Sequence, residues 1–166
     1  MKNVSSEPII DESDAKKIIL ENQESMGLSQ KGLKLVFNSS ETIEDCDFYH
    51  YDLTYNGIPV YGKEITVSAD QNDNPYLMIG NCEEIADIST VPSITTKQAV
   101  NIANDETGQQ NFTDAKLVLY PVEDKFVLAY ICNSMDSLNV IDAQNGSVIK
   151  NESTILTASL IRFSFI

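Results

Sequence analysis

The chain of 166 residues is 42% apolar and has a formal net charge of −14. At this length folding buries about 68–70% of the surface that the unfolded chain exposes, so we expect a folded protein rather than a disordered one. Acidic residues outnumber basic ones 25 to 11, which argues against nucleic acid and anionic membrane surfaces as partners, because both require clustered Lys and Arg.

The first predicted element is an amphipathic helix over Asp11–Met26. Apolar side chains recur there at helical spacing, and the first turn is acidic, which suits the helix dipole. Gly27 follows as a residue that can end the helix. The face expected to be buried carries Ala15, Ile18 and Ile19.

The next segments are typical of antiparallel strands. The run "FYHYDLTY" alternates tyrosine and leucine with polar residues, at the period of two that marks a half-buried strand. Asn56-Gly57 follows at once and predicts a type I′ hairpin turn, because both residues tolerate a positive φ. Strands are therefore expected at 33–37, 48–55, 58–69 and 76–81.

A second helix and a second set of strands follow. Thr95 and Gln98 have the spacing of a capping box, and Gly108 ends the apolar stripe that they precede. Three runs that resemble strands come next, at 116–122, 125–132 and 138–149, and the last contains another Asn-Gly pair. The chain thus reads twice as a helix packed on an antiparallel sheet, an α+β fold of two consecutive units joined by a linker in residues 85–93.

The sequence offers weak candidates for chemistry. His50 shares a strand face with Asp52, so an Asp-His couple is geometrically compatible, but no nucleophile motif accompanies it. A single His also cannot supply the zinc site of H-E-x-x-H. The loop 70–74 resembles a calcium loop without the Gly and the final Glu of an EF-hand, so a turn is expected. We assign no catalytic, metal or cofactor-binding residue.

Cysteine usage and hydropathy add further bounds. Cys46, Cys82 and Cys132 are widely spaced and odd in number, which indicates neither a zinc ribbon nor a disulfide scaffold, although one bridge is compatible with the count. No apolar run approaches the ~20 residues that span a bilayer, so no direct membrane insertion is expected. The opening "MKNVSSEPII" lacks the apolar stretch of a signal peptide.

Residues 48–81 resemble the signature of the fungalysin/thermolysin propeptide (FTP) domain. In that signature an aromatic-rich strand ends in Tyr-x-Gly-(Val/Ile)-Pro-Val-(Phe/Tyr)-Gly and is followed by a second strand and a Gly-Asn ending. The resemblance implies an FTP-like domain over residues 1–88. The residues that carry it are Tyr55, Gly57, Ile58, Pro59, Val60, Tyr61, Gly62, Gly80 and Asn81.

Residues 89–152 resemble a PepSY domain, the module that follows the FTP domain in the same propeptides. Its helix, its Leu-x-x-Tyr-Pro…Leu-Ala-Tyr hairpin and its (Val/Ile)-Asp-Ala-x-x-Gly-x-(Val/Ile) ending occur in the family's order. The residues that carry this resemblance include Tyr120, Pro121, Tyr130, Asp142, Ala143 and Gly146.

In this family the propeptide precedes a zinc metallopeptidase of the thermolysin type, helps it to fold, and inhibits it until it is cleaved away. The present chain ends where the protease domain would begin and contains no H-E-x-x-H, so we expect it not to be an enzyme. The leading hypothesis is a propeptide-like protein that binds a thermolysin-type metallopeptidase and inhibits it, assists its folding, or both. The resemblance implies an extracellular or cell-envelope location.

Two alternatives stay open. PepSY domains also resemble parts of proteins that are not propeptides, so the chain is compatible with an extracellular or envelope binding module that has no peptidase partner. The other alternative is that the chain is a truncated remnant of a protease precursor. The sequence predicts neither the identity of the partner nor the oligomeric state.

The segment 153–166 forms an apolar C-terminal tail at the place of the family's processing site. One hypothesis is that the tail lies extended along a peptidase cleft, where apolar pockets would accept its side chains. An added strand, or a tail left by truncation of a longer reading frame, is the favoured alternative. The candidate contact residues are Leu160, Ile161, Phe163, Phe165 and Ile166.

Overall fold

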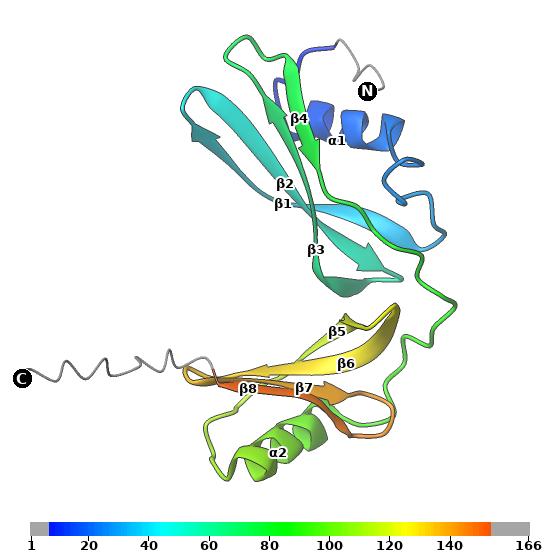
Figure 1. Cartoon of the computed structure of the whole chain (residues 1–166), viewed down its shortest axis with the longest axis vertical. Coiled ribbons are helices and arrows are strands. Elements are labelled where there is room, and N and C mark those ends of the chain that lie inside the picture. The colour runs from blue at the N-terminus through cyan, green and yellow to red at the C-terminus, as the bar shows by residue number, and fades with distance from the viewer. Residues whose placement is uncertain (1–6, 154–166) are drawn as a thin grey trace, which may run out of the picture. The chain divides into compact units, whose positions relative to one another are not determined.

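A computed structural model describes residues 7–153, which form two helices and eight strands (Figure 1). The fold class is α+β, as predicted. No helix in these residues is long and apolar enough to cross a bilayer. The elements are α1 (Glu12–Glu21), β1 (Leu33–Ile43), β2 (Cys46–Tyr55), β3 (Ile58–Ala69), β4 (Pro75–Ile79), α2 (Thr96–Thr107), β5 (Lys116–Val122), β6 (Lys125–Asn133), β7 (Ser137–Asp142) and β8 (Val148–Ser153).

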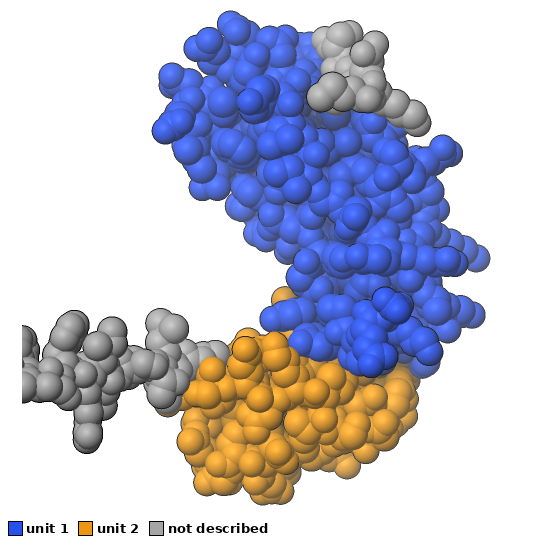
Figure 2. Space-filling model, viewed as in Figure 1, with its two compact units in different colours: residues 1–90, 118–127 blue, residues 91–117, 128–166 orange. Residues whose placement is uncertain are grey.

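The chain divides into two compact units, which Figure 2 colours separately. Unit 1 comprises residues 1–90 with 118–127, and unit 2 comprises 91–117 with 128–166. Unit 1 thus includes a stretch from the β5–β6 region, which meets β3 in a parallel bridge between Val60 and Leu119. The functional domains expected at 1–88 and 89–152 stay a prediction.

Helix α1 begins where its acidic first turn predicts. The Asp11 carboxylate is the N-cap and accepts hydrogen bonds from the backbone N–H groups of Ser13 and Asp14. The helix ends at Glu21 rather than at Met26, so the predicted end was wrong. The cause is local: the Asn22 side chain donates to the Ile18 carbonyl at 2.9 Å, an alternative partner that competes with the helical ladder.

The β1–β4 sheet of unit 1 buries the face that alternation predicts. The odd-numbered residues from Tyr49 to Tyr55 on β2 are buried, while Asp52 is exposed. Tyr51 is fully buried, and its hydroxyl donates to the backbone carbonyl of Glu12, which ties the sheet to α1. Burial raises the pKa of Tyr51 to about 12.

Strand β1 extends to Ile43, six residues beyond the predicted end at Phe37. The added residues 38–43 are exposed, so they carry no hydrophobic period that sequence reasoning could detect. They pair with β2 after a register shift between Phe37 and Ser39, which is the mark of a β-bulge.

Helix α2 of unit 2 has both predicted ends. Thr95 and Gln98 form a reciprocal capping box, and Gly108 closes the helix in the left-handed conformation at φ 65°. The helix packs against β7 in the antiparallel β6–β7–β8 sheet (Figure 1). Ala99 and Ala103 are fully buried against this sheet, whose β6 is buried from Leu128 to Cys132.

The second Asn-Gly pair does not form the turn that the first one forms. Gly146 has a positive φ of 77°, whereas Asn145 does not have a positive φ. A type I′ turn requires positive φ at both residues, so this pair does not form one. The Asp142 carboxylate instead accepts hydrogen bonds from the backbone N–H groups of Gln144 and Asn145 at 2.7 and 3.1 Å. An Asx turn within a longer loop therefore joins β7 to β8.

Candidate functional site

The residues of the first motif build the β2–β3 hairpin. Asn56 and Gly57 have φ values of 48° and 85°, so both adopt the positive φ of the predicted type I′ turn. The buried Tyr55 and Val60 flank this turn, and the Asn56 backbone N–H donates to the Gly32 carbonyl at 2.9 Å. Pro59 pairs with the β2 strand across a register shift. These residues shape the backbone and carry no reactive arrangement.

The remaining glycines of this motif have different surroundings. Gly62 has a φ of 70° with open space around it, whereas Gly80 has a φ of 112° and lies against β3. A Cβ at Gly80 would approach the Glu64 carbonyl oxygen to 2.3 Å. Asn81 is exposed. The Gly80-Asn81 ending is therefore a close approach of backbone to backbone, which only glycine permits.

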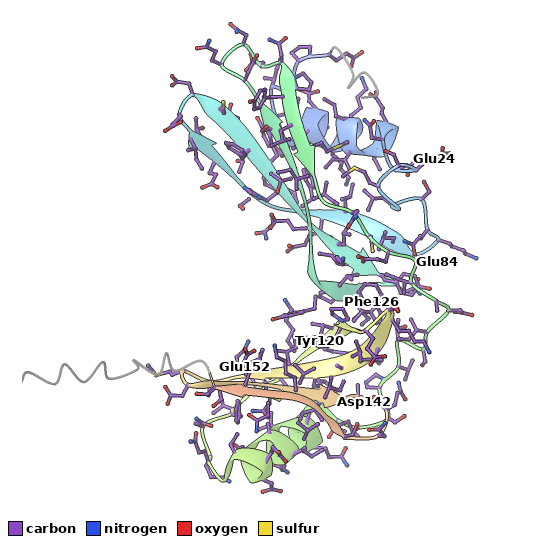
Figure 3. All side chains as sticks on the ribbon, in the orientation of Figure 1. Glu24, Glu84, Tyr120, Phe126, Asp142 and Glu152 are labelled. Atoms are coloured by element: carbon purple, nitrogen blue, oxygen red, sulfur yellow. The ribbon has the colours of Figure 1, made fainter. Side chains whose placement is uncertain are left out.

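The second motif is also structural. The rings of Tyr61 and Tyr120 lie 5.1 Å apart within unit 1, and Tyr120 is labelled in Figure 3. The neighbouring Pro121 is exposed. The Tyr130 hydroxyl donates to the Ile94 carbonyl at 3.1 Å, which holds the segment before α2 against the sheet of unit 2.

The Asp-Ala-x-x-Gly ending of the second motif organises the β7–β8 loop (Figure 3). The buried Ala143 accepts backbone hydrogen bonds from Ser93 and Ile94 and donates one to Leu128. Gly146 donates to the Asp142 carbonyl at 2.9 Å. The ending therefore joins the linker, the sheet and the turn in one hydrogen-bonded cluster.

His50 lies in a cluster that differs from the Asp-His couple considered above. Its Nδ1 is 2.9 Å from Glu64 Oε1, and its Nε2 is 3.5 Å from Glu41 Oε1. Thr66 Oγ1 completes the group at 3.1 Å from Nδ1. Asp52 accepts instead from the Asn38 amide at 3.2 Å. The hydrogen bond to His50 lowers the pKa of Glu64.

The His50 cluster lacks the Ser or Cys nucleophile of a hydrolytic triad. Within the described residues, the hydrogen-bonded partners of the imidazole include no cysteine and no serine. Within residues 7–153, no group of three or more His, Cys, Asp or Glu side chains is placed so that it could hold a metal ion. Two glutamates and a threonine around one histidine form a polar surface cluster.

The loop 70–74 is a turn, as predicted, because backbone N–H groups of the loop donate hydrogen bonds to the Asp70 carboxylate. Asp70 Oδ1 accepts from the backbone N–H groups of Asn72 and Asn74 at 2.8 and 2.9 Å. These hydrogen bonds lower the pKa of Asp70.

The three cysteines are free thiols. Burial raises the pKa of Cys82, and it raises the pKa of Cys132 to about 11. Cys132 lacks the electropositive surroundings of a reactive cysteine, since the negative charge of Asp114 also raises its pKa. At Cys82 the charge of Lys63 lowers the pKa, but the effect of burial is larger.

The sheet face opposite α1 is the remaining candidate surface, and sequence reasoning missed it. This open face presents the even-numbered residues of β2, such as Phe48 and His50, together with their cross-strand partners on β1, β3 and β4. The run "YLMIGN" gave one signal, since apolar residues continue on both faces of β4, where Leu77 and Ile79 are exposed. The predicted tail contacts Leu160, Ile161, Phe163, Phe165 and Ile166 lie outside the described residues.

Comparison with known proteins identifies the first motif. Residues 47–82 match the Fungalysin/Thermolysin Propeptide Motif. The chain is 31% identical over 143 residues to Neutral protease B of Bacillus subtilis (strain 168), which covers 74% of this chain and 27% of that protein. It is also 31% identical over 127 residues to Bacillolysin of Brevibacillus brevis, and this alignment covers 64% of this chain and 24% of that protein.

Among solved structures, the Bacillus megaterium YpeB C-terminal domain aligns with a TM-score of 0.46 and 16% identity, over 92% of this chain and 69% of that one. The chain spans about a quarter of the length of the two curated relatives, at 27% and 24%. The resemblance to the propeptide region of thermolysin-type peptidases is thus confirmed. The PepSY-like assignment of residues 89–152 stays a prediction.

Proposed function

We propose that the chain is a propeptide-like protein that binds a thermolysin-type zinc metallopeptidase and inhibits it, assists its folding, or both. The observation that carries the proposal is the propeptide motif at 47–82 in a chain whose curated relatives are proteases. The motif residues shape turns and close backbone approaches, so we assign them a structural role. No residue of the chain has a catalytic or cofactor role in this proposal.

Inhibition and assisted folding follow from one interface. A protein that binds the folded peptidase and not its unfolded chain stabilises the folded form by about 2.7 kcal/mol when present at a hundred times Kd. If the same interface blocks access to the substrate cleft, the bound peptidase is also inhibited. An extracellular or cell-envelope location is proposed from the same resemblance.

The test uses the mature peptidase part of Neutral protease B, the relative with 31% identity. The full chain is added during hydrolysis of a peptide substrate and, separately, during refolding of the denatured peptidase. We expect dose-dependent inhibition, a higher yield of active enzyme on refolding, or both. An unrelated acidic protein of similar net charge is the control for non-specific attraction.

A negative result in this test would reject the proposal. No complex and no effect across a panel of thermolysin-type peptidases would reject the proposal in favour of an envelope binding module without a peptidase partner.

The apolar tail enters the proposal as a separate hypothesis. Leu160, Phe163 and the neighbouring apolar residues would lie extended along the peptidase cleft. Because β8 runs to Ser153, a variant ending there keeps the last strand whole, whereas a cut at Asn151 would shorten it. Equal inhibition by the full chain and by the variant ending at Ser153 would remove the tail from the mechanism.

A further inference from the structure

The open face of the unit 1 sheet carries exposed apolar side chains. Leu77 and Ile79 of β4 are 44% and 56% exposed, and Ile43 of β1 is 49% exposed. Phe48, which is partly exposed, lies in the same cross-strand row as Leu77, and the fully buried Ser68 lies between them. An antiparallel sheet with one solvated face normally places polar side chains there, so exposed apolar side chains on this face are typical of an interaction site.

Carboxylates lie next to this apolar group. Glu41 lies opposite Phe48, and it shares the His50 imidazole with Glu64. The side chains of Glu41 and Glu64 are 58% and 47% exposed, so a partner can reach both. While both carboxylates are ionised, one imidazole cannot neutralise them even when protonated. The cluster therefore keeps a negative charge beside the apolar side chains.

The charge of the surrounding sequence has the same sign. Residues 1–91 contain 17 acidic and 6 basic side chains. Electrostatic complementarity across interfaces speeds association and fixes orientation. A partner for this face should therefore present Lys and Arg side chains around an apolar centre.

The face has the dimensions of a protein interface. Strands lie ~4.8 Å apart and rise ~3.3 Å per residue, so four strands about nine residues long cover roughly 500 Å² in projection. Side-chain relief raises the accessible area above this projection. A standard interface buries about 800 Å² on each partner, so the open face can supply most of one side.

We propose that the open face of the β1–β4 sheet is the surface on which the peptidase domain docks, through apolar contacts at Leu77, Ile79 and Phe48 and ion pairs at Glu41 and Glu64. This inference rests on the proposed function and assigns its interface. The occupant is the folded peptidase, presenting cationic side chains around an apolar patch.

The apolar contribution is tested with two variants of one strand. The double variant Leu77→Thr and Ile79→Thr changes the open face, and Tyr76→Thr is its matched control. Tyr76 is 72% exposed and lies at the β3–β4 register shift, so it has no cross-strand partner in the rows of Leu77 and Ile79. A few residues near the centre of an interface carry most of its binding energy, so we expect affinity for the peptidase to fall about tenfold or more in the double variant. Tyr76→Thr should retain the wild-type Kd.

The charged contribution is tested by salt dependence. The double variant Glu41→Gln and Glu64→Gln should bind more weakly at low salt and should lose less affinity than wild type as salt rises, because screening acts on the removed charges. Glu24→Gln, on the exposed segment after α1 (labelled in Figure 3), is the control. Circular dichroism confirms that each variant is folded.

The outcomes separate the two proposals. A wild-type chain that binds the peptidase while both open-face variants bind equally well would overturn the docking surface and leave the proposed function standing. A wild-type chain that does not bind would overturn both. A wild-type dimer that the open-face variants convert to monomers, with peptidase binding unchanged, would assign this face to a second copy of the chain and overturn the inference.

Discussion

Gly80 and Gly57 differ in their surroundings but share a positive φ, so alanine at each position separates two physical costs. Their φ values are 112° and 85°. A Cβ at Gly57 meets no atom within 4 Å, whereas a Cβ at Gly80 would lie 2.3 Å from the Glu64 carbonyl oxygen and 2.8 Å from Ile65 Cδ1. Gly57→Ala therefore carries backbone strain alone, and Gly80→Ala adds a steric clash.

The magnitudes follow from these two costs. Backbone strain in the left-handed region costs about 1–2 kcal/mol per residue, which is the expected loss of unfolding free energy for Gly57→Ala. Overpacking costs a further 1–3 kcal/mol or so, so Gly80→Ala should lose about 2–5 kcal/mol. With an m-value of about 1–3 kcal/mol/M in urea, the difference of about 2 kcal/mol separates the two midpoints by roughly 1 M.

Urea unfolding followed by far-ultraviolet circular dichroism measures both variants and the wild type under one condition. Failure of Gly80→Ala to fold, with Gly57→Ala folded, would be the extreme form of the expected result. Equal losses would refute the reasoning, because they would show that the approach of Gly80 to the Glu64 carbonyl does not constrain the backbone. Equal m-values are needed for the comparison, since a changed m-value reports a changed compactness.

Three further predictions concern titratable groups. Tyr51→Phe leaves the Glu12 carbonyl without its donor and should cost about 1–3 kcal/mol of unfolding free energy. Because burial raises the Tyr51 pKa to about 12, the stability of the wild type should also fall as pH rises from about 10 to 12. This fall should be weaker in the variant. The Glu64 pKa is lowered by His50, so its contribution is present above the ordinary glutamate pKa and lost as pH falls below it; Glu64→Gln should flatten this acid loss in pH-dependent urea unfolding. The buried Cys132, with a pKa raised to about 11, should resist a thiol reagent at pH 8 until urea unfolds the chain, and rapid native labelling would contradict its burial.

Local signals in the sequence predicted the elements that depend on local chemistry. The bounds of β3 and of helix α2 follow from an Asn-Gly turn and a capping box, and both match the structure. The buried side of β2 follows from strict alternation between Tyr49 and Tyr55. In each case the residues that decide the structure lie within a few positions of one another.

The misplaced elements depend on groups that no local pattern reveals. The end of β1 at Ile43 is set by pairing with β2, because its last residues have no buried side. The Asn145-Gly146 pair has the composition of a type I′ turn, but the Asp142 carboxylate accepts hydrogen bonds from the backbone N–H groups of Gln144 and Asn145 and forms a different turn. Whether a side chain or a backbone carbonyl accepts from a given N–H group depends on their positions in space, which a local sequence pattern does not give.

The candidate surface shows why binding sites are harder to predict than folds in a chain of this kind. Alternation on β2 predicts which face is buried, but β4 carries apolar side chains on both faces, so its own sequence does not say which of them stay exposed. The packing of α1 on the face that carries Tyr51 leaves Leu77 and Ile79 exposed on the other side. A group of exposed apolar residues on one face is typical of an interaction site, and the open-face variants test whether the partner there is the peptidase.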